Sequence, residues 1–191
     1  MVGIYEKKDV EIGIIGGTGA DIAIENAEKF KVYTPYGAPS DMITIGTFKG
    51  KKVAFLSRHG PGHGIPPHGL NYRANIYAMK MIGVQRIFSP CAVGGLTPQT
   101  DKGQFVVVDQ YIDRTKGRQD TFYDGNVVAH ISEAEPFCPE MNDIFFKAGQ
   151  ELGIPITNGG TYVCIQGPRF STRAESKMFA KWGGDVVGMT V

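Results

Sequence analysis

Apolar residues occur along this chain in short runs that alternate with segments of helical spacing. The runs predict strands at 11–15, 42–48, 52–57, 86–90, 105–112, 160–166 and 185–191. Between them, three segments carry apolar residues on one helical face and end at Gly83, Gly153 and Gly183. The third begins with the capping-box spacing of Thr172 and Glu175. This alternation predicts an α/β fold with a mixed β-sheet flanked by helices, in a single domain over residues 1–191.

Composition narrows the class of protein. Lys and Arg number 20 and Asp and Glu 19 in 191 residues, a balance that argues against nucleic acid or an anionic membrane as partner. No apolar run approaches the roughly 20 residues of a membrane span, and residues 1–9 lack a signal-peptide core. Three cysteines without CxxC spacing argue against disulfides and zinc. We therefore expect a cytoplasmic protein.

Two glycine-rich turns after strands are candidate anion sites. Arg58 and His59 follow the run 52–57, and three of the four histidines lie between positions 59 and 68. Arginine offers a planar fork of donors that matches phosphate, and histidine adds a donor whose charge changes near neutral pH. The turn around Thr18, Gly16-Gly17-Thr18-Gly19, lets backbone N–H groups approach an oxyanion. The two turns predict a phosphate or phosphorylated substrate, although a plain tight turn also fits the second.

Other segments leave alternatives open. His59, His63 and His68 are close in sequence, but their loop contains no Asp or Glu and is not helical, so we expect no metal. Backbone N–H groups near Cys91 and Ala92 fit a third phosphate contact; a Cys91 nucleophile paired with His59 and an inert buried cysteine are the alternatives.

The segment that runs into the last helix offers a second set of alternatives. Phe170 fits an aromatic platform for a flat ring, with Ser171 as its polar neighbour, or else a core residue followed by a helix cap. His130 lies far from the other three histidines in the sequence, and a purely structural role fits it.

Taken together, the motifs resemble those of the trimeric purine nucleoside phosphorylases, most closely the 5′-methylthioadenosine phosphorylases. The matching segments occur in the order of that family and cover essentially the whole chain: Ile14–Gly19, Arg58–Gly60, Asn71–Ile76, Asp109–Thr115, Thr121–Gly125, Ala134–Pro139 and Gly167–Ser171. The resemblance implies phosphorolysis of methylthioadenosine to adenine and 5-methylthioribose 1-phosphate, with inorganic phosphate as co-substrate and no cofactor.

The resemblance also implies site residues. Phosphate would be held by Thr18, Arg58, His59, Cys91, Ala92 and Thr190. The nucleoside would be contacted by Met189, Phe170, Ser171, His63, Pro67 and His130. His130 matches a residue that reaches the 5′ end of the substrate from a neighbouring subunit, which implies a homotrimer.

The chain departs from the family in two respects. Pro90-Cys91 stands where relatives often carry hydroxyl or amide side chains, so a contact there would rely on backbone N–H groups. The chain also ends at Val191, where relatives continue; we expect it to lack the C-terminal part of the fold and the purine-reading Asp or Asn, so no catalytic residue is assigned. The alternatives are a 6-oxopurine nucleoside or methylthioinosine phosphorylase, a catalytically impaired nucleoside or phosphate binder, and a Cys91 hydrolase.

Overall fold

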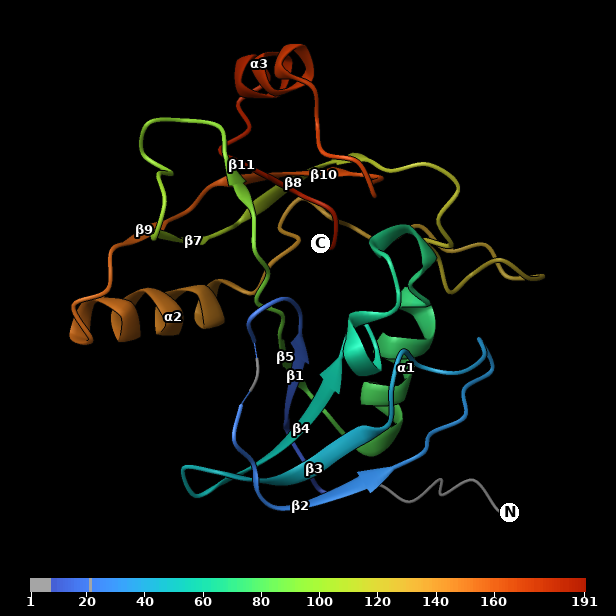
Figure 1. Ribbon diagram of the computed structural model, residues 1–191. Helices are drawn as coiled ribbons and strands as arrows, with labels where there is room; N and C mark the ends of the chain where they lie inside the picture. Colours follow the sequence, from blue (N-terminus) through green and yellow to red (C-terminus); the bar gives the residue numbers. More distant parts are fainter. Residues whose placement is uncertain (1–7, 21) are drawn as a thin grey trace. The chain divides into compact units, whose positions relative to one another are not determined.

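The computed structural model describes residues 8–20 and 22–191, and the chain divides into two compact units (Figure 1). The first unit comprises the chain up to Ala92 together with 118–124, and the second comprises 93–117 and 125–191. The predicted α/β class with mixed sheets and flanking helices is confirmed. The strands form three sheets, however, where the sequence suggested one. A single domain over 1–191 stays a prediction.

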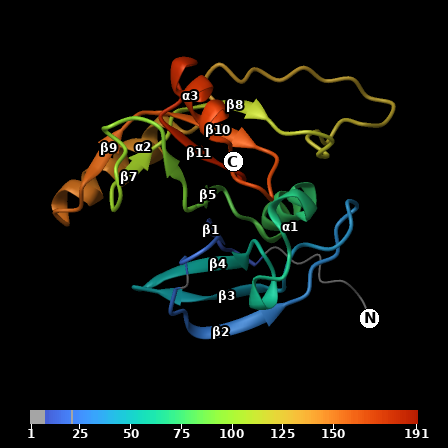
Figure 2. The same ribbon diagram turned by 45° about the horizontal axis from the view of Figure 1, so that its top comes forward.

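The first unit is built on a five-stranded sheet in the order β2-β3-β4-β1-β5 (Figures 1 and 2). Its strands are β1 (Ile12–Gly16), β2 (Glu25–Phe30), β3 (Ile43–Phe48), β4 (Lys51–Ser57) and β5 (Arg86–Phe88). β4, β1 and β5 are parallel, whereas β3 is antiparallel to both β2 and β4. The three parallel strands therefore end at the same edge of the sheet.

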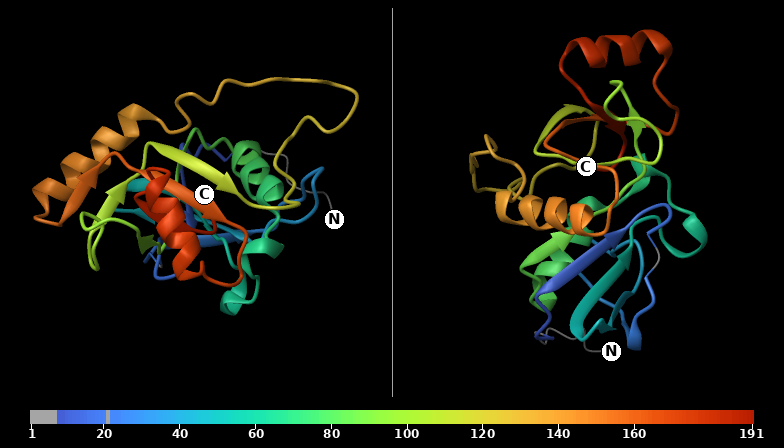
Figure 3. Two further views of the ribbon diagram at one scale, coloured as in Figure 1. Left: turned by 90° about the horizontal axis from the view of Figure 1, so that it is seen from above. Right: turned by 90° about the vertical axis from the view of Figure 1, so that its left-hand side faces the viewer.

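The helix α1 (Tyr72–Ile82) packs against this sheet (Figures 1 and 3). The Asn71 side chain caps its first turn by accepting the Ala74 N–H at 3.1 Å. Gly83 ends the helix at φ 105, in the left-handed region that glycine enters without penalty, as the sequence predicted. The buried face of the helix joins the sheet in one apolar core that includes Ile15, Ile43, Leu56, Ala78 and Met79. Burial of these side chains supplies most of the driving force for this unit.

The second unit contains two sheets and two helices (Figure 3). Its larger sheet has the order β6-β11-β10-β8, and its smaller sheet pairs β7 with β9. The elements are β6 (Gly94–Gly95), β7 (Phe105–Val107), β8 (Gln110–Arg114), α2 (Pro139–Glu151), β9 (Ile156–Asn158), β10 (Thr161–Ile165), α3 (Arg173–Lys181) and β11 (Val186–Gly188). Tyr162, Val163, Phe179 and Val186 are buried in this unit.

The predicted strands differ from the observed ones in several places. The expected strand 105–112 is interrupted, because β7 pairs with β9 while β8 pairs with β10 in a different sheet. At the break, the Asp109 carboxylate accepts the Gly160 N–H at 3.1 Å. The sequence also missed β2, an edge strand in which every residue except Phe30 is exposed, so that no apolar alternation marks it. β6 and β9 are too short to leave a pattern.

The capping box at the start of α3 predicts that the stability of the folded protein falls at acid pH. Thr172 Oγ1 accepts the Glu175 N–H at 3.1 Å, and the Glu175 carboxylate accepts the Thr172 N–H at 2.7 Å and two Arg169 N–H groups at 2.8 Å each. The Arg169 hydrogen bonds, and then the Thr172 backbone, lower the pKa of Glu175 from 4.5 to about 2. Because the folded pKa is depressed, this stabilisation is present above the unfolded pKa and is lost as pH falls from 4.5 towards 2.

We therefore expect the chain to have a higher Tm than its Glu175→Gln variant above about pH 5, and we expect this difference to shrink as the pH is lowered. Thermal unfolding of both proteins across the acid range measures the difference. A gap that stays constant down to about pH 2.5 would show that the carboxylate charge is irrelevant to α3.

None of the helices in the described part of the chain is sufficiently long and apolar to span a membrane.

Candidate anion and nucleoside site residues

The strand order of the first unit brings three loops to one edge of its sheet. β1 lies between β4 and β5, and in the parallel register Gly16 is opposite Ser57 while Ile14 is opposite Phe88. The residues that follow these strands therefore emerge side by side. Ligands of open α/β sheets gather at this edge, where strands end in loops.

Arg58 is held at this edge by all three strand ends. It is 3% exposed, and its backbone N–H donates to the Gly16 carbonyl at 2.8 Å. Its Nη1 donates to Ser89 Oγ at 3.1 Å, and its Nη2 lies 3.5 Å from the Pro90 carbonyl oxygen. The buried Nε has no hydrogen-bond partner among the described residues. A buried guanidinium with donors to spare favours an anion.

Gly17 leaves room for this guanidinium. A Cβ atom at Gly17 would lie 1.8 Å from Arg58 Nη2 and 2.8 Å from Cζ, which is closer than atoms can approach. The predicted turn after β1 therefore has a steric reason for glycine: the backbone passes directly beside the arginine. Ser89 was not among the expected site residues, because nothing in the sequence indicates that this serine accepts a hydrogen bond from Arg58, 31 residues away.

His59 and His63 lie beside the arginine, together with Thr18. The two imidazole rings are 4.3 Å apart, and Thr18 Oγ1 is 3.4 Å from His63 Nε2. Four of the residues expected in the first unit, namely Thr18, Arg58, His59 and His63, thus lie in one cluster, here called the anion cluster. Among the described residues, no group of three His, Cys, Asp or Glu side chains is placed to hold a metal ion.

The hydrogen bond of His59 fixes its tautomer. Its Nδ1 lies 2.8 Å from the Ile65 carbonyl oxygen, and because a carbonyl can only accept, Nδ1 carries the proton. In the neutral ring, Nε2 is therefore an unprotonated acceptor. Burial lowers the pKa of His59 below 6.5, and Arg58 and His63 lower it further, against the raising effect of the Ile65 carbonyl. The lowered pKa favours the neutral ring, which must gain a proton before it can donate from Nε2.

The remaining expected residues of the first unit follow β5 or lie in the loop between β4 and α1. Cys91 is half-buried and Ala92 is exposed. Pro67 is half-buried in a short 3-10 turn, Pro67–Gly69, and its carbonyl accepts the Tyr72 hydroxyl at 2.8 Å. A phosphate role for Cys91 and Ala92 stays a prediction.

In the second unit, Phe170 and Ser171 lie in the turn between β10 and α3. Phe170 is 85% exposed, so the alternative that it belongs to the core is wrong. Ser171 does not cap α3 either: Thr172 is the cap, and the Ser171 hydroxyl pairs with Ser176 Oγ at 2.9 Å. An exposed aromatic ring beside a hydroxyl is compatible with the platform expected for a flat base.

Met189, Thr190 and His130 complete the expected set. A Cβ atom at Gly167 would lie 2.6 Å from Met189 Sδ, so Met189 packs directly against the turn after β10. The Thr190 N–H donates to Tyr162 Oη at 3.3 Å. His130 is exposed within residues 125–138, which contain neither helix nor strand and are drawn in yellow and ochre in Figure 2. The phosphate contact of Thr190 stays a prediction.

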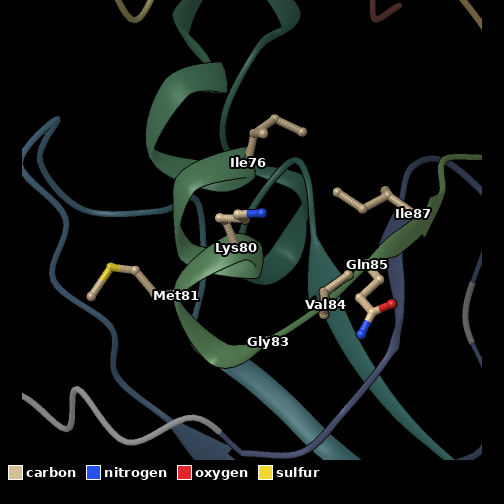
Figure 4. A pocket seen from close by; sticks show the side chains of 7 residues that line it. All are labelled: Ile76, Lys80, Met81, Gly83, Val84, Gln85 and Ile87. Atoms are coloured by element: carbon tan, nitrogen blue, oxygen red, sulfur yellow. The ribbon is translucent and has the colours of Figure 1, made fainter.

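A separate hollow of about 710 Å³ lies in the first unit at the C-terminal end of α1. In Figure 4 the Ile76 and Lys80 side chains extend from the helix towards Ile87 on β5. Its lining residues are Ile76, Lys80, Met81, Gly83, Val84, Gln85 and Ile87. None of the expected site residues lines it.

Known proteins match this chain over nearly its full length. Residues 11–191 match the family model described as "Phosphorylase superfamily". An S-methyl-5′-thioadenosine phosphorylase of Thermofilum pendens is 54% identical over 184 residues, which are 95% of this chain and 70% of that protein.

Solved structures give the same result. A methylthioadenosine phosphorylase from an Antarctic soil metagenomic library superimposes with a TM-score of 0.91 at 46% identity, covering 96% of this chain and 66% of the other. The Schistosoma mansoni methylthioadenosine phosphorylase in complex with adenine gives a TM-score of 0.90 at 36% identity, covering 95% and 74%.

Proposed function

Because this chain belongs to the phosphorylase superfamily, we propose that it cleaves S-methyl-5′-thioadenosine with inorganic phosphate, yielding adenine and 5-methylthioribose 1-phosphate. The observation that carries the proposal is the 54% identity to a methylthioadenosine phosphorylase across 95% of the chain. The anion cluster supports it, because Arg58 offers a cation, Thr18 a hydroxyl and His59 an imidazole that can gain a proton, all suited to phosphate.

The proposed reaction is a displacement at C1′ of the sugar. An oxygen of phosphate forms a bond to C1′ as the C1′–N9 bond breaks, and the electron pair of that bond leaves with the purine. The proton that the base gains balances the one that hydrogen phosphate gives up. Positive charge develops on the sugar in the transition state, so a fixed phosphate dianion both attacks and stabilises it. The anion cluster then acts by holding phosphate in place.

The test is to incubate the 191-residue chain with methylthioadenosine, with and without phosphate, and to measure free adenine by chromatography. The proposal expects adenine only with phosphate, at a rate unchanged by a chelator, since we propose no metal or cofactor. Inosine and methylthioinosine serve as parallel substrates. Faster turnover of either would assign the chain to 6-oxopurines, and stabilisation by phosphate without turnover would make it a binding protein.

The neutral state of His59 predicts that anion binding takes up a proton. A bound dianion favours the imidazolium form, so the pKa of His59 is higher in the complex than in the free protein. Affinity therefore rises as pH falls through the bound-state pKa and levels off below the free-state pKa. Sulfate is a suitable probe because it stays dianionic throughout, so that only the protein titrates.

We expect tighter sulfate binding at about pH 5.5 than at about pH 8, and a flatter profile for His59→Asn. Calorimetric titration measures both. Equal pH dependence in the two proteins would mean that His59 is not the titrating group.

For the second unit we propose that Phe170, Ser171 and Met189 contact the nucleoside. The exposed Phe170 ring supports this role, because a base can stack on it without rearrangement of a core. Phe170→Ala is expected to raise KM for methylthioadenosine while the KM for phosphate stays unchanged. A parallel rise in both constants would contradict the assignment.

We propose further that the chain works in the cytoplasm as a homotrimer in which His130 faces a neighbouring subunit. Large apolar side chains around it support a protein partner: Val127, Val128 and Ile131 are 65%, 83% and 68% exposed. Sedimentation equilibrium should give three times the mass of the chain, and Val128→Asp should dissociate the trimer. A monomeric wild-type protein would overturn the proposal.

A further inference from the structure

A chain of hydrogen bonds runs from Arg118 to the loop between β4 and α1 (residues 58–71). Arg118 Nη1 donates to Tyr72 Oη at 2.9 Å, and the Tyr72 hydroxyl donates to the Pro67 carbonyl at 2.8 Å. The Arg118 guanidinium also lies over the Tyr72 ring, 5.0 Å from its centroid. All three residues belong to the first unit and are half-buried. A hydroxyl that accepts from a cation is a better donor, so the two bonds reinforce each other.

The loop that accepts the hydrogen bond from Tyr72 contains little regular structure of its own. It contains two single-turn 3-10 segments, Pro61–His63 and Pro67–Gly69, neither with a side-chain cap or a buried residue. His63 is held at φ 60, a left-handed conformation that is unfavourable for a residue with a Cβ atom. Such a conformation persists only where the surroundings determine it. Inside the loop, the His63 N–H donates to the Gly60 carbonyl at 3.2 Å.

Arg118 is itself fixed, because the segment 118–124 is fastened to the first turn of α1. Arg73 Nη1 donates to the Thr121 carbonyl at 3.0 Å and pairs with the Asp124 carboxylate. The Phe122 ring packs edge-on against Tyr36, with ring centroids 5.2 Å apart. The backbone that carries Arg118 is therefore anchored to α1.

From these contacts we infer that Arg118 is a positioning residue, which acts through the Tyr72 hydroxyl to hold the loop that carries His63 and Pro67. The inference rests on the proposed function and on the family resemblance, which implies that His63 and Pro67 contact the nucleoside. Arg58, which we propose to bind phosphate, begins the same loop but is held by the Gly16 carbonyl and Ser89 Oγ. The effect of Arg118 should therefore appear in nucleoside binding and spare phosphate binding.

The experiment uses Tyr72→Phe, Arg118→Met and the double variant in the full 191-residue chain. The loss of one supporting hydrogen bond predicts a rise of about three- to tenfold in KM for methylthioadenosine, with kcat and the KM for phosphate unchanged. In the inference, the effect of Arg118 on the loop passes through the Tyr72 hydroxyl, so the rise in KM for methylthioadenosine should be no larger in the double variant than in Tyr72→Phe. Tyr33→Phe, which removes the hydroxyl of a half-exposed tyrosine elsewhere in the same unit, is the matched control.

Hydrogen exchange of peptides that cover residues 59–70 gives a readout independent of turnover. Faster exchange in Tyr72→Phe and Arg118→Met, but not in Tyr33→Phe, supports the positioning role, whereas unchanged exchange overturns it. A wild-type chain that releases no adenine refutes the proposed function, and the exchange result still decides whether Arg118 supports the loop. If the wild type is active, additive losses in the double variant or a matching rise in the phosphate KM overturn the inference.

Discussion

Replacing Arg58 with methionine is expected to lower kcat/KM for phosphate by about a hundred- to thousandfold, the usual cost of removing a donor from a site that stabilises charge. The guanidinium is 3% exposed and is oriented by Ser89 and by the strand ends, so it meets the anion without reorganisation. Methionine keeps most of the buried side-chain volume and removes the charge and all five donors. Steady-state rates over a range of phosphate concentrations measure the effect.

Arg58→Lys separates charge from geometry. Lysine retains the positive charge but lacks the planar fork, so an intermediate loss is expected. Arg86→Met is the matched control, since Arg86 is exposed at the opposite end of β5 from the anion cluster. If Arg86→Met and Arg58→Met reduced activity equally, the effect would be a general loss of folding or charge and the anion cluster would lose its assigned role.

Gly17→Ala is expected to lower kcat/KM for phosphate by about a hundredfold, although it removes no functional group. The backbone at Gly17 does not have a positive φ, so alanine is conformationally acceptable there. Its Cβ, however, would lie 1.8 Å from Arg58 Nη2 and must displace the guanidinium. Misplacement of a binding group by about 1 Å is sufficient for a loss of this size.

Gly125→Ala provides the control for Gly17→Ala, because a Cβ at Gly125 would meet no atom within 4 Å. Calorimetric titration with phosphate should show weak binding to Gly17→Ala alone, with both variants folded by circular dichroism. Wild-type phosphate affinity in Gly17→Ala would show that the arginine does not need its observed position.

Local signals in the sequence were sufficient for most of the fold. Gly83 could be predicted as the end of α1 because left-handed backbone favours glycine, and Thr172 as a cap because its partner Glu175 is only three residues away. β2 could not be predicted, since its polar side chains belong to an exposed edge strand. The break between β7 and β8 is set by pairing with strands about 50 residues later, which no local pattern encodes.

The candidate site divides in the same way. The turns around Thr18 and Arg58 were visible as glycine-rich ends of apolar runs, and the parallel pairing of β1 with β4 explains why they meet. The roles of Met189 and His130 came only from the family resemblance, whereas the sequence itself offered Phe170 either as an aromatic platform or as a core residue. The link from Arg118 to Tyr72 spans 46 residues and joins two side chains of ordinary type, so it emerges only from the structure.

The most direct test of the central claim is to follow phosphate itself during the reaction with methylthioadenosine. Phosphorus NMR of the 191-residue chain with substrate should show inorganic phosphate converted to a sugar 1-phosphate, in equal amount to the adenine released. Adenine released while inorganic phosphate stays constant would mean hydrolysis and would contradict the account.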